Sequence, residues 1–179
     1  MKKILTIVLL LTLIAFTLIS GTMALYTVKI DNFASGSVVA KEFIFTKGGT
    51  DTFTDNVKIA PTETKTMSFS VKNFESDTKY SEVPMKVDFT VSIDAADGKE
   101  LIDPLKFVVK NEDDVNIGDS VTGSGQITFS IELEENTKEE HTFTVEILWQ
   151  SDDEVDINYA GEGHGSAITV SATATQKVN

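Results

Sequence analysis

The chain of 179 residues has no Cys and no Arg, two His and three Pro, and these shortages exclude several kinds of site. Without Cys there is no disulfide framework, thiolate zinc site, iron–sulfur cluster or cysteine nucleophile. The 15 cationic side chains are all Lys and stand against 28 Asp and Glu, so the formal net charge is −13. Because a nucleic-acid-binding surface must be basic to replace phosphate counterions, we expect no nucleic-acid partner.

The first 24 residues have the layout of a secretory signal peptide. Two Lys precede an apolar run from Ile4 to Phe16, and no further charge appears before Lys29. A cationic end, an apolar middle and small residues near the cut site are typical of such signals. The small-x-small spacing is met by Thr22-Met23-Ala24, so we predict that a signal peptidase cleaves between Ala24 and Leu25.

An uncleaved membrane anchor is the alternative, because the 25 residues from Ile4 to Val28 carry no charge and are long enough to span a bilayer. The signal would then be the chain's attachment to the membrane. Cleavage would leave 155 residues and remove two Lys, which takes the net charge from −13 to −15. A chain of this length can bury one core without cross-links. We therefore expect residues 1–24 to be the signal and residues 25–179 to form a single domain.

After the signal, apolar and polar residues alternate in short runs, as they do in a strand with one buried face. The clearest run is Met85–Ile93. Similar runs are Met67–Lys72, Ile127–Leu133, Phe143–Ile147 and Ile168–Ala174, and shorter ones are Val28–Ile30, Phe43–Phe45, Val57–Ile59 and Leu105–Val109.

Residues that favour chain reversal separate these runs. They are Gly48-Gly49, Pro61, Asn73, Asp97-Gly98, Gly118, Gly123 and Gly125. Helical spacing is weak, and we expect at most a short turn of helix around Ala95 and Ala96. Many short strands joined by turns predict an all-β fold. We expect an antiparallel β-sandwich, with a jelly roll as its finer form.

The sequence motifs indicate no catalytic residues, no cofactor and no strong metal site. His141 and His164 lack the His-Glu-x-x-His spacing that binds zinc, so we interpret both as solvated loop or edge residues. The acidic run Asp152–Asp156 offers either a weak calcium site or, as charge runs generally do, a solvated loop. Trp149 is interpreted as a core or rim residue, with a sugar-binding platform as the alternative.

A set of short motifs spans residues 22–176. They are Thr22-Met23-Ala24, Tyr26, Phe33–Gly36, Pro61, Asn73, Trp149, Asn158–Gly161 and Ala174–Gln176. In this order they resemble the TasA/camelysin family of exported Gram-positive proteins. The family usually has Gly after the proline of the turn, where this chain has Thr62.

The resemblance implies a secreted jelly-roll protein that is cut by a signal peptidase of the SipW type. In the TasA branch, subunits assemble into fibres of the extracellular biofilm matrix, and the new N-terminal segment adds as a strand to the sheet of the next subunit. The corresponding donor strand here consists of Leu25, Tyr26, Thr27, Val28, Lys29 and Ile30. The implied partners are other copies of the chain, joined head to tail, and an accessory matrix protein. The leading hypothesis is thus a structural protein and not an enzyme.

Three alternatives remain open at this point. The camelysin branch implies a secreted metal-dependent peptidase, which the unpaired histidines speak against. A monomeric surface domain that binds carbohydrate or protein is the second alternative. The third concerns the donor segment only, because Leu25–Ile30 is equally suited to be the first strand of its own sandwich.

Overall fold

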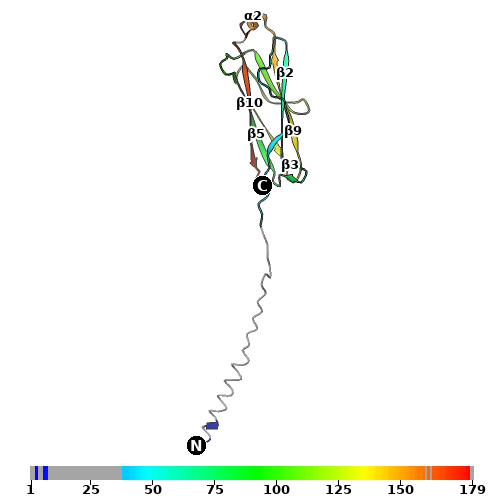
Figure 1. Ribbon diagram of the computed structural model, residues 1–179, viewed down its shortest axis with the longest axis vertical. Helices are drawn as coiled ribbons and strands as arrows, with labels where there is room; N and C mark the ends of the chain where they lie inside the picture. The colour runs from blue at the N-terminus through cyan, green and yellow to red at the C-terminus, as the bar shows by residue number, and fades with distance from the viewer. Residues whose placement is uncertain (1–2, 4–5, 8–37, 160, 162, 178–179) are drawn as a thin grey trace. The chain divides into compact units, whose positions relative to one another are not determined.

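The alternating runs form two antiparallel sheets in the computed structural model, which describes residues 3, 6–7, 38–159, 161 and 163–177 (Figure 1). By its internal contacts the chain divides into two units, Met1–Val39 and Ala40–Asn179, and both sheets belong to the second. The predicted cleavage site, the donor strand and the run Val28–Ile30 lie outside the described residues. Among the described residues, no helix is long and apolar enough to cross a membrane.

The larger sheet has five strands in the order β1-β2-β9-β6-β7. In chain order they are β1 (Thr46–Asp51), β2 (Thr64–Lys72), β6 (Leu105–Lys110), β7 (Asn116–Thr122) and β9 (Glu140–Trp149). The central strand β9 pairs with β2 from Thr64↔Leu148 to Lys72↔Glu140 without a register shift. Every second side chain of β9 is therefore buried, beginning at Phe143 and ending at Trp149.

The smaller sheet has three strands in the order β10-β5-β8. They are β5 (Met85–Ala95), β8 (Gly125–Leu133) and β10 (Ser166–Gln176). The central strand β5 pairs with β10 over its whole length, from Ser166↔Ala95 to Gln176↔Met85. Outside the two sheets lie the short hairpin β3 (Phe74–Ser76) and β4 (Lys79–Tyr80), the helix α2 (Asp153–Asp156) and the 3-10 helix η1 (Ile157–Tyr159).

Aromatic rings join the two sheets in the core. Phe89 of β5 is stacked on Phe129 of β8, with ring centroids 4.7 Å apart and planes 8° apart. Phe143 of β9 lies 5.2 Å from Phe89 and 5.1 Å from Phe129. Phe69 of β2 lies 5.4 Å from Phe143. Since these rings come from four strands of both sheets, they hold the sandwich together through buried apolar area and ring contacts.

The predicted all-β sandwich is confirmed, and its finer assignment as a jelly roll stays a prediction. Strands form at every long alternating run and at Leu105–Val109. The predicted strands Phe43–Phe45 and Val57–Ile59 are wrong, because those residues make no ladder, although Ile44 is buried and Ile59 packs against the core. Alternate burial of a side chain therefore does not require a paired backbone.

Three predictions about turns are also wrong. The expected helical turn around Ala95 and Ala96 is absent, because β5 continues through Ala95 and a turn follows at Asp97-Gly98. Gly48-Gly49, expected to reverse the chain, lies inside β1. Gly118, also expected in a turn, lies inside β7 with a φ of 72°.

Thr62, in the turn before β2, has a φ of 73°. This left-handed region costs an L-residue roughly 1–2 kcal/mol, and a β-branched side chain suits it least. A hydrogen bond holds the turn in place, because the Thr62 N–H donates to the Trp149 carbonyl oxygen at 2.9 Å. A Gly at this position would adopt the same conformation without strain.

Replacing Thr62 with Gly is expected to raise the free energy of unfolding by about 1 kcal/mol, since the relief of backbone strain exceeds the entropic cost of Gly. The matched control is Thr64→Gly at the exposed first residue of β2, which is expected to lower that free energy by about 0.5–1 kcal/mol. Urea denaturation of both variants measures the difference. A Thr62→Gly variant less stable than the wild type would contradict the expectation.

Candidate assembly groove

The strand β10 forms a free edge of the smaller sheet and carries no charged residue in its eleven positions. It pairs with β5 in continuous register, without a bulge, and in the described residues no strand pairs with its other side. Proteins normally protect such an edge with charge, Pro or a bulge, because its unpaired N–H and C=O groups can pair with another chain. In Figure 1, β10 is the red strand beside β5, and it ends near the C-terminus.

A groove lies between β10 and the edge strand of the other sheet, β1. Its volume is about 360 Å³. Its floor is formed by Phe69 and Phe89, and its walls include Phe45 and Phe53, which flank β1, and Val170 and Ala172 of β10. Lys47 and Asp51, which pair with each other, stand at its rim. We call this space the β1–β10 groove.

The inner face of β10 is defined by its partners on β5. Ile168, Val170, Ala172 and Ala174 pair with Ile93, Val91, Phe89 and Val87, all of which are buried. The inner side chains are thus larger near the start of β10 and small toward its end. A strand laid along the free edge would form main-chain hydrogen bonds with β10 and point alternate side chains into the groove.

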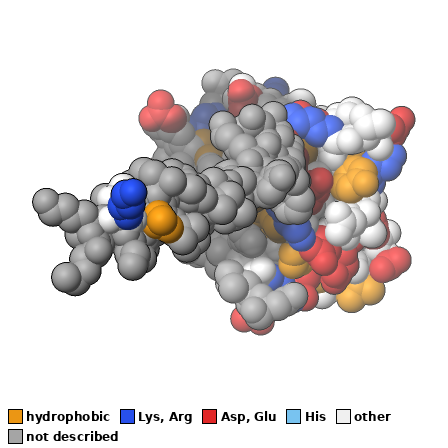
Figure 2. Space-filling model, turned by 90° about the horizontal axis from the view of Figure 1, so that it is seen from below, with side chains coloured by type: hydrophobic (Ala, Val, Ile, Leu, Met, Phe, Trp, Pro, Cys, Tyr) orange, Lys and Arg blue, Asp and Glu red, His pale blue; other side chains and the backbone are white. Residues whose placement is uncertain are grey.

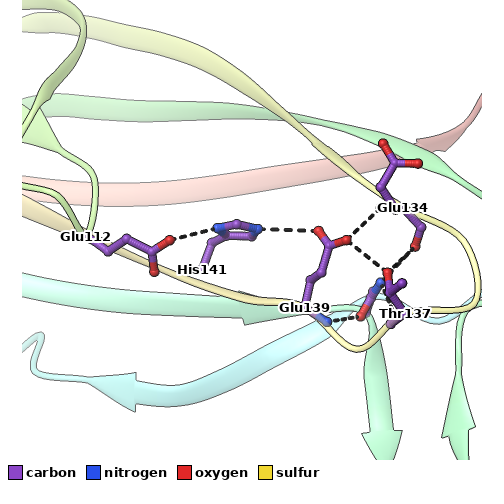
Figure 3. A network of polar contacts seen from close by, with 6 residues as sticks. Glu112, Glu134, Thr137, Glu139 and His141 are labelled. Carbon is purple, nitrogen blue, oxygen red and sulfur yellow. Dashed lines mark hydrogen bonds and ion pairs between the residues drawn. The ribbon is translucent and has the colours of Figure 1, made fainter.

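A second cavity, of about 320 Å³, lies at the other side of the sandwich, between β8 and the turn that joins β6 to β7. His141 lines it together with Phe129 and Phe143. Its ring lies between the carboxylates of Glu112 and Glu139 (Figure 3). The Nδ1 atom is 3.4 Å from Glu112 Oε1, and the Nε2 atom is 3.5 Å from Glu139 Oε2. The neutral imidazole has one N–H and can donate to only one of these carboxylates.

Asn73 stabilises the turn that joins β8 to β9. Its side chain is fully buried, and Nδ2 donates to the carbonyl oxygens of Glu134 and Thr137 at 3.2 and 3.0 Å. Its Oδ1 accepts from the Glu139 N–H at 2.8 Å. The Glu139 carboxylate in turn accepts from the Thr137 hydroxyl at 2.9 Å (Figure 3). The sequence predicts Asn73 only as a residue of its own turn and of a motif. The structure shows that its side chain also holds the turn between β8 and β9.

The predicted histidines lie in different surroundings. His141 is at the start of β9, and its side chain is 33% exposed. His164 contacts the ring of Tyr159, and its Nδ1 is buried, so the prediction that it is solvated is wrong for that atom. Within the described part of the chain, no group of three or more His, Asp or Glu side chains is placed to hold a metal ion.

Trp149 is a core residue, which confirms its interpretation as a core or rim residue, and the alternative of a sugar-binding platform is wrong. Its side chain is buried, and the indole N–H donates to Asp156 Oδ1 at 2.6 Å. Asp156 also accepts from the Asp152 N–H at 2.9 Å, and Asp152 accepts from the Glu154 N–H at 3.2 Å. The carboxylates of Asp152 and Asp156 therefore bind donors of the protein itself.

The acidic clusters lie mainly in the turns between strands. Glu112-Asp113-Asp114 lies between β6 and β7, and Glu134-Glu135 lies between β8 and β9. Figure 2 shows Asp and Glu side chains with scattered Lys on the visible face of the molecule. Because β10 carries none of this charge, its edge differs from the acidic turns.

Comparison of the chain with models of protein families, with curated proteins and with solved structures found no match.

Proposed function

We propose that the protein is a secreted structural subunit that assembles head to tail into fibres of the extracellular matrix, and that it is not an enzyme. The observation that supports this most is the open side of the sandwich, where the uncharged edge of β10 borders the apolar β1–β10 groove. An edge strand beside a groove suits strand addition, in which main-chain hydrogen bonds give affinity and side-chain pockets give specificity.

The proposed occupant of the groove is Leu25–Ile30 of a second copy, the segment that follows the predicted cleavage site. In an extended strand, Tyr26, Val28 and Ile30 share one face. These side chains are large and apolar, and the inner face of β10 is small at Ala172 and Ala174. The incoming strand would therefore supply the apolar volume that β10 lacks.

Head-to-tail addition uses two different surfaces of each subunit, so it generates filaments when the rotation between subunits does not close a ring. Cleavage by a signal peptidase of the SipW type would release the donor segment for assembly, and before cleavage the signal would hold the chain at the membrane. The proposal also includes an accessory matrix protein as a partner and a jelly-roll connectivity of the strands. Both follow from the motifs that resemble the TasA branch.

The test is removal of the donor strand. A chain that begins at Leu25 is expected to grow into filaments, and a chain that begins at Asp31 is expected to remain a monomer. The shorter chain should keep its circular dichroism spectrum and its thermal midpoint, because Ala40–Asn179 forms a compact unit of its own. Negative-stain electron microscopy and sedimentation at several concentrations measure the two outcomes.

A matched pair of substitutions separates side-chain fit from segment length. Val28→Lys places a charge on the face that enters the groove and should stop growth, whereas Thr27→Lys places it on the opposite face and should be tolerated. Filaments that grow equally well without residues 25–30 would overturn the proposal. A wild-type protein whose sedimentation does not change with concentration would favour a monomeric surface domain.

A further inference from the structure

The edge strand β1 is attached to its sheet in an unusual way. Its ladder with β2 contains only Thr46↔Lys72, Lys47↔Val71 and Asp51↔Phe69, with an irregularity between Lys47 and Asp51. The intervening Gly48, Gly49 and Thr50 therefore lie outside the regular pairing. A bulge of this kind leaves backbone groups without ladder partners.

Side chains of other strands bind these backbone groups. The Gly49 N–H donates to Glu140 Oε1 at 2.7 Å, although Glu140 lies on β9, beyond β2. The Thr50 N–H donates to Ser70 Oγ at 2.9 Å, and the Ser70 hydroxyl donates to the same Glu140 oxygen at 2.9 Å. One carboxylate oxygen thus holds the middle of β1, directly through Gly49 and indirectly through the buried Ser70.

This contact requires Gly at position 48. A Cβ atom built there would overlap with Ser70 Oγ and Glu140 Oε1 and would lie 2.8 Å from Ser70 Cβ. At Gly49 a Cβ atom would lie 3.7 Å from Glu140 Oε1, an ordinary van der Waals distance. The two neighbouring glycines therefore differ in what an Ala would disturb, which provides a matched pair for experiment.

The charge of Glu140 strengthens the contact, since hydrogen bonds to a carboxylate are about twice as strong as neutral ones. The Gly49 N–H is the main cause that lowers the pKa of Glu140 below its ordinary value of 4.5, followed by the Ser70 hydroxyl, with desolvation opposing them. Lys72 of β2 also lowers this pKa. The charged groups of β1 itself are Lys47 and Asp51, which pair with each other. Glu139 and His141, which adjoin Glu140 in the sequence, pair with each other as well.

We propose that Glu140 is a positioning residue for the β1–β10 groove: by holding β1 on the sheet, it fixes the groove wall against which the strand of a second copy packs. Phe45 and Phe53 flank β1 and line the groove, so the position of β1 sets the position of this wall. The role in assembly rests on the proposed function, whereas the hold on β1 does not.

The experiment compares Glu140→Gln, Gly48→Ala and the control Gly49→Ala in the chain that begins at Leu25. Hydrogen exchange of the Gly49 and Thr50 amides is measured at concentrations too low for assembly, and filament elongation is measured at higher concentrations. We expect exchange at both amides to rise about tenfold or more in Gly48→Ala, less in Glu140→Gln and not at all in Gly49→Ala. Elongation should fall in the same order.

A pH profile separates this role from a general loss of stability. Because the folded-state pKa of Glu140 is lowered, the carboxylate holds β1 fully above about pH 4.5 and releases it as the pH falls through the lowered pKa. Protection of the two amides, corrected for intrinsic exchange, should follow this titration in the wild type. In Glu140→Gln this step should be lost. Asp51, whose pKa is also lowered, chiefly by Lys47, is present in both proteins, so the difference between the two profiles reports Glu140.

Unchanged exchange in both Glu140→Gln and Gly48→Ala would overturn the proposal. Faster exchange together with undiminished or faster elongation would also overturn it, because β1 would then cover the groove instead of forming its wall. If the wild type itself does not elongate, the proposed function fails. The exchange measurement would still test whether Glu140 holds β1 on the sheet.

Discussion

Replacing Ala172 with Lys is expected to slow filament elongation by about 100-fold while the sandwich stays folded. Ala172 lies on the inner face of β10 and lines the groove, but its side chain is exposed in the isolated subunit, so the Lys has water to reach. An added strand would remove that water. Burying an unpaired ammonium costs several kcal/mol, and about 3 kcal/mol of this cost in the transition state for strand addition corresponds to about 100-fold in rate. Light scattering of the chain that begins at Leu25 measures the rate.

The control for Ala172→Lys is Thr173→Lys, which adds the same charge one residue further along β10. Thr173 is exposed on the outer face, opposite Asp88 of β5. Its Lys would stay in water after strand addition, so elongation should change by less than about tenfold. Equal effects of the two substitutions would show that charge alone, and not the groove, decides assembly. No effect of Ala172→Lys would remove β10 as the acceptor edge.

Most of the sandwich could be predicted because burial on one face of a strand leaves a pattern of period two. In Met85–Ile93, every predicted inward residue is buried in the structure. The same physics predicted the centres of β2, β8, β9 and β10. The strand ends were less well predicted, since Glu140 and His141 begin β9 without any alternation of apolar residues.

The strand β1 could not be predicted, because Thr46–Asp51 contains no apolar residue and its Gly pair favours a turn. In the middle of β1 the Gly49 N–H donates to Glu140, which is 91 residues away in the sequence. A local pattern carries no information about such a partner. Gly48 is needed for close approach of the backbone to the Ser70 and Glu140 side chains, and neither glycine reverses the chain, because both lie inside β1.

Only part of the candidate groove could be predicted from the sequence. The eleven residues of β10 carry no charge in a chain of net charge −13, and this contrast is visible in the sequence. The cavity beside β10 could not be predicted, because it forms where Phe53, which follows β1, meets Phe69 of β2 and Phe89 of β5. The spacing of residues along one strand does not indicate which side chains from other parts of the chain it will contact.

Buried polar residues were missed for the same reason. Asp156 belongs to an acidic run that suggests a solvated loop, yet its side chain is buried because the Trp149 indole donates to it. Buried polar groups persist where partners are supplied by the fold, and those partners are known only once the fold is known.

Replacing Phe89 with Ala is expected to lower the free energy of unfolding by about 3–5 kcal/mol, the usual cost of removing a fully buried Phe. Phe89 is 1% exposed, and its ring lies 4.7 Å from Phe129, 5.2 Å from Phe143 and 6.1 Å from Phe69, so the lost volume lies where both sheets meet. Urea denaturation below the concentration for assembly measures the change.

The control for Phe89→Ala is Phe53→Ala. Phe53 also lines the groove, but it is only partly buried and makes its ring contact with Phe69 at 6.1 Å. Its loss should therefore cost less than about 2 kcal/mol of stability. Elongation should nevertheless slow in Phe53→Ala, because this variant loses part of the groove wall while its sandwich remains folded. A Phe53→Ala variant that elongates like the wild type would contradict this separation, and so would a Phe89→Ala variant as stable as Phe53→Ala.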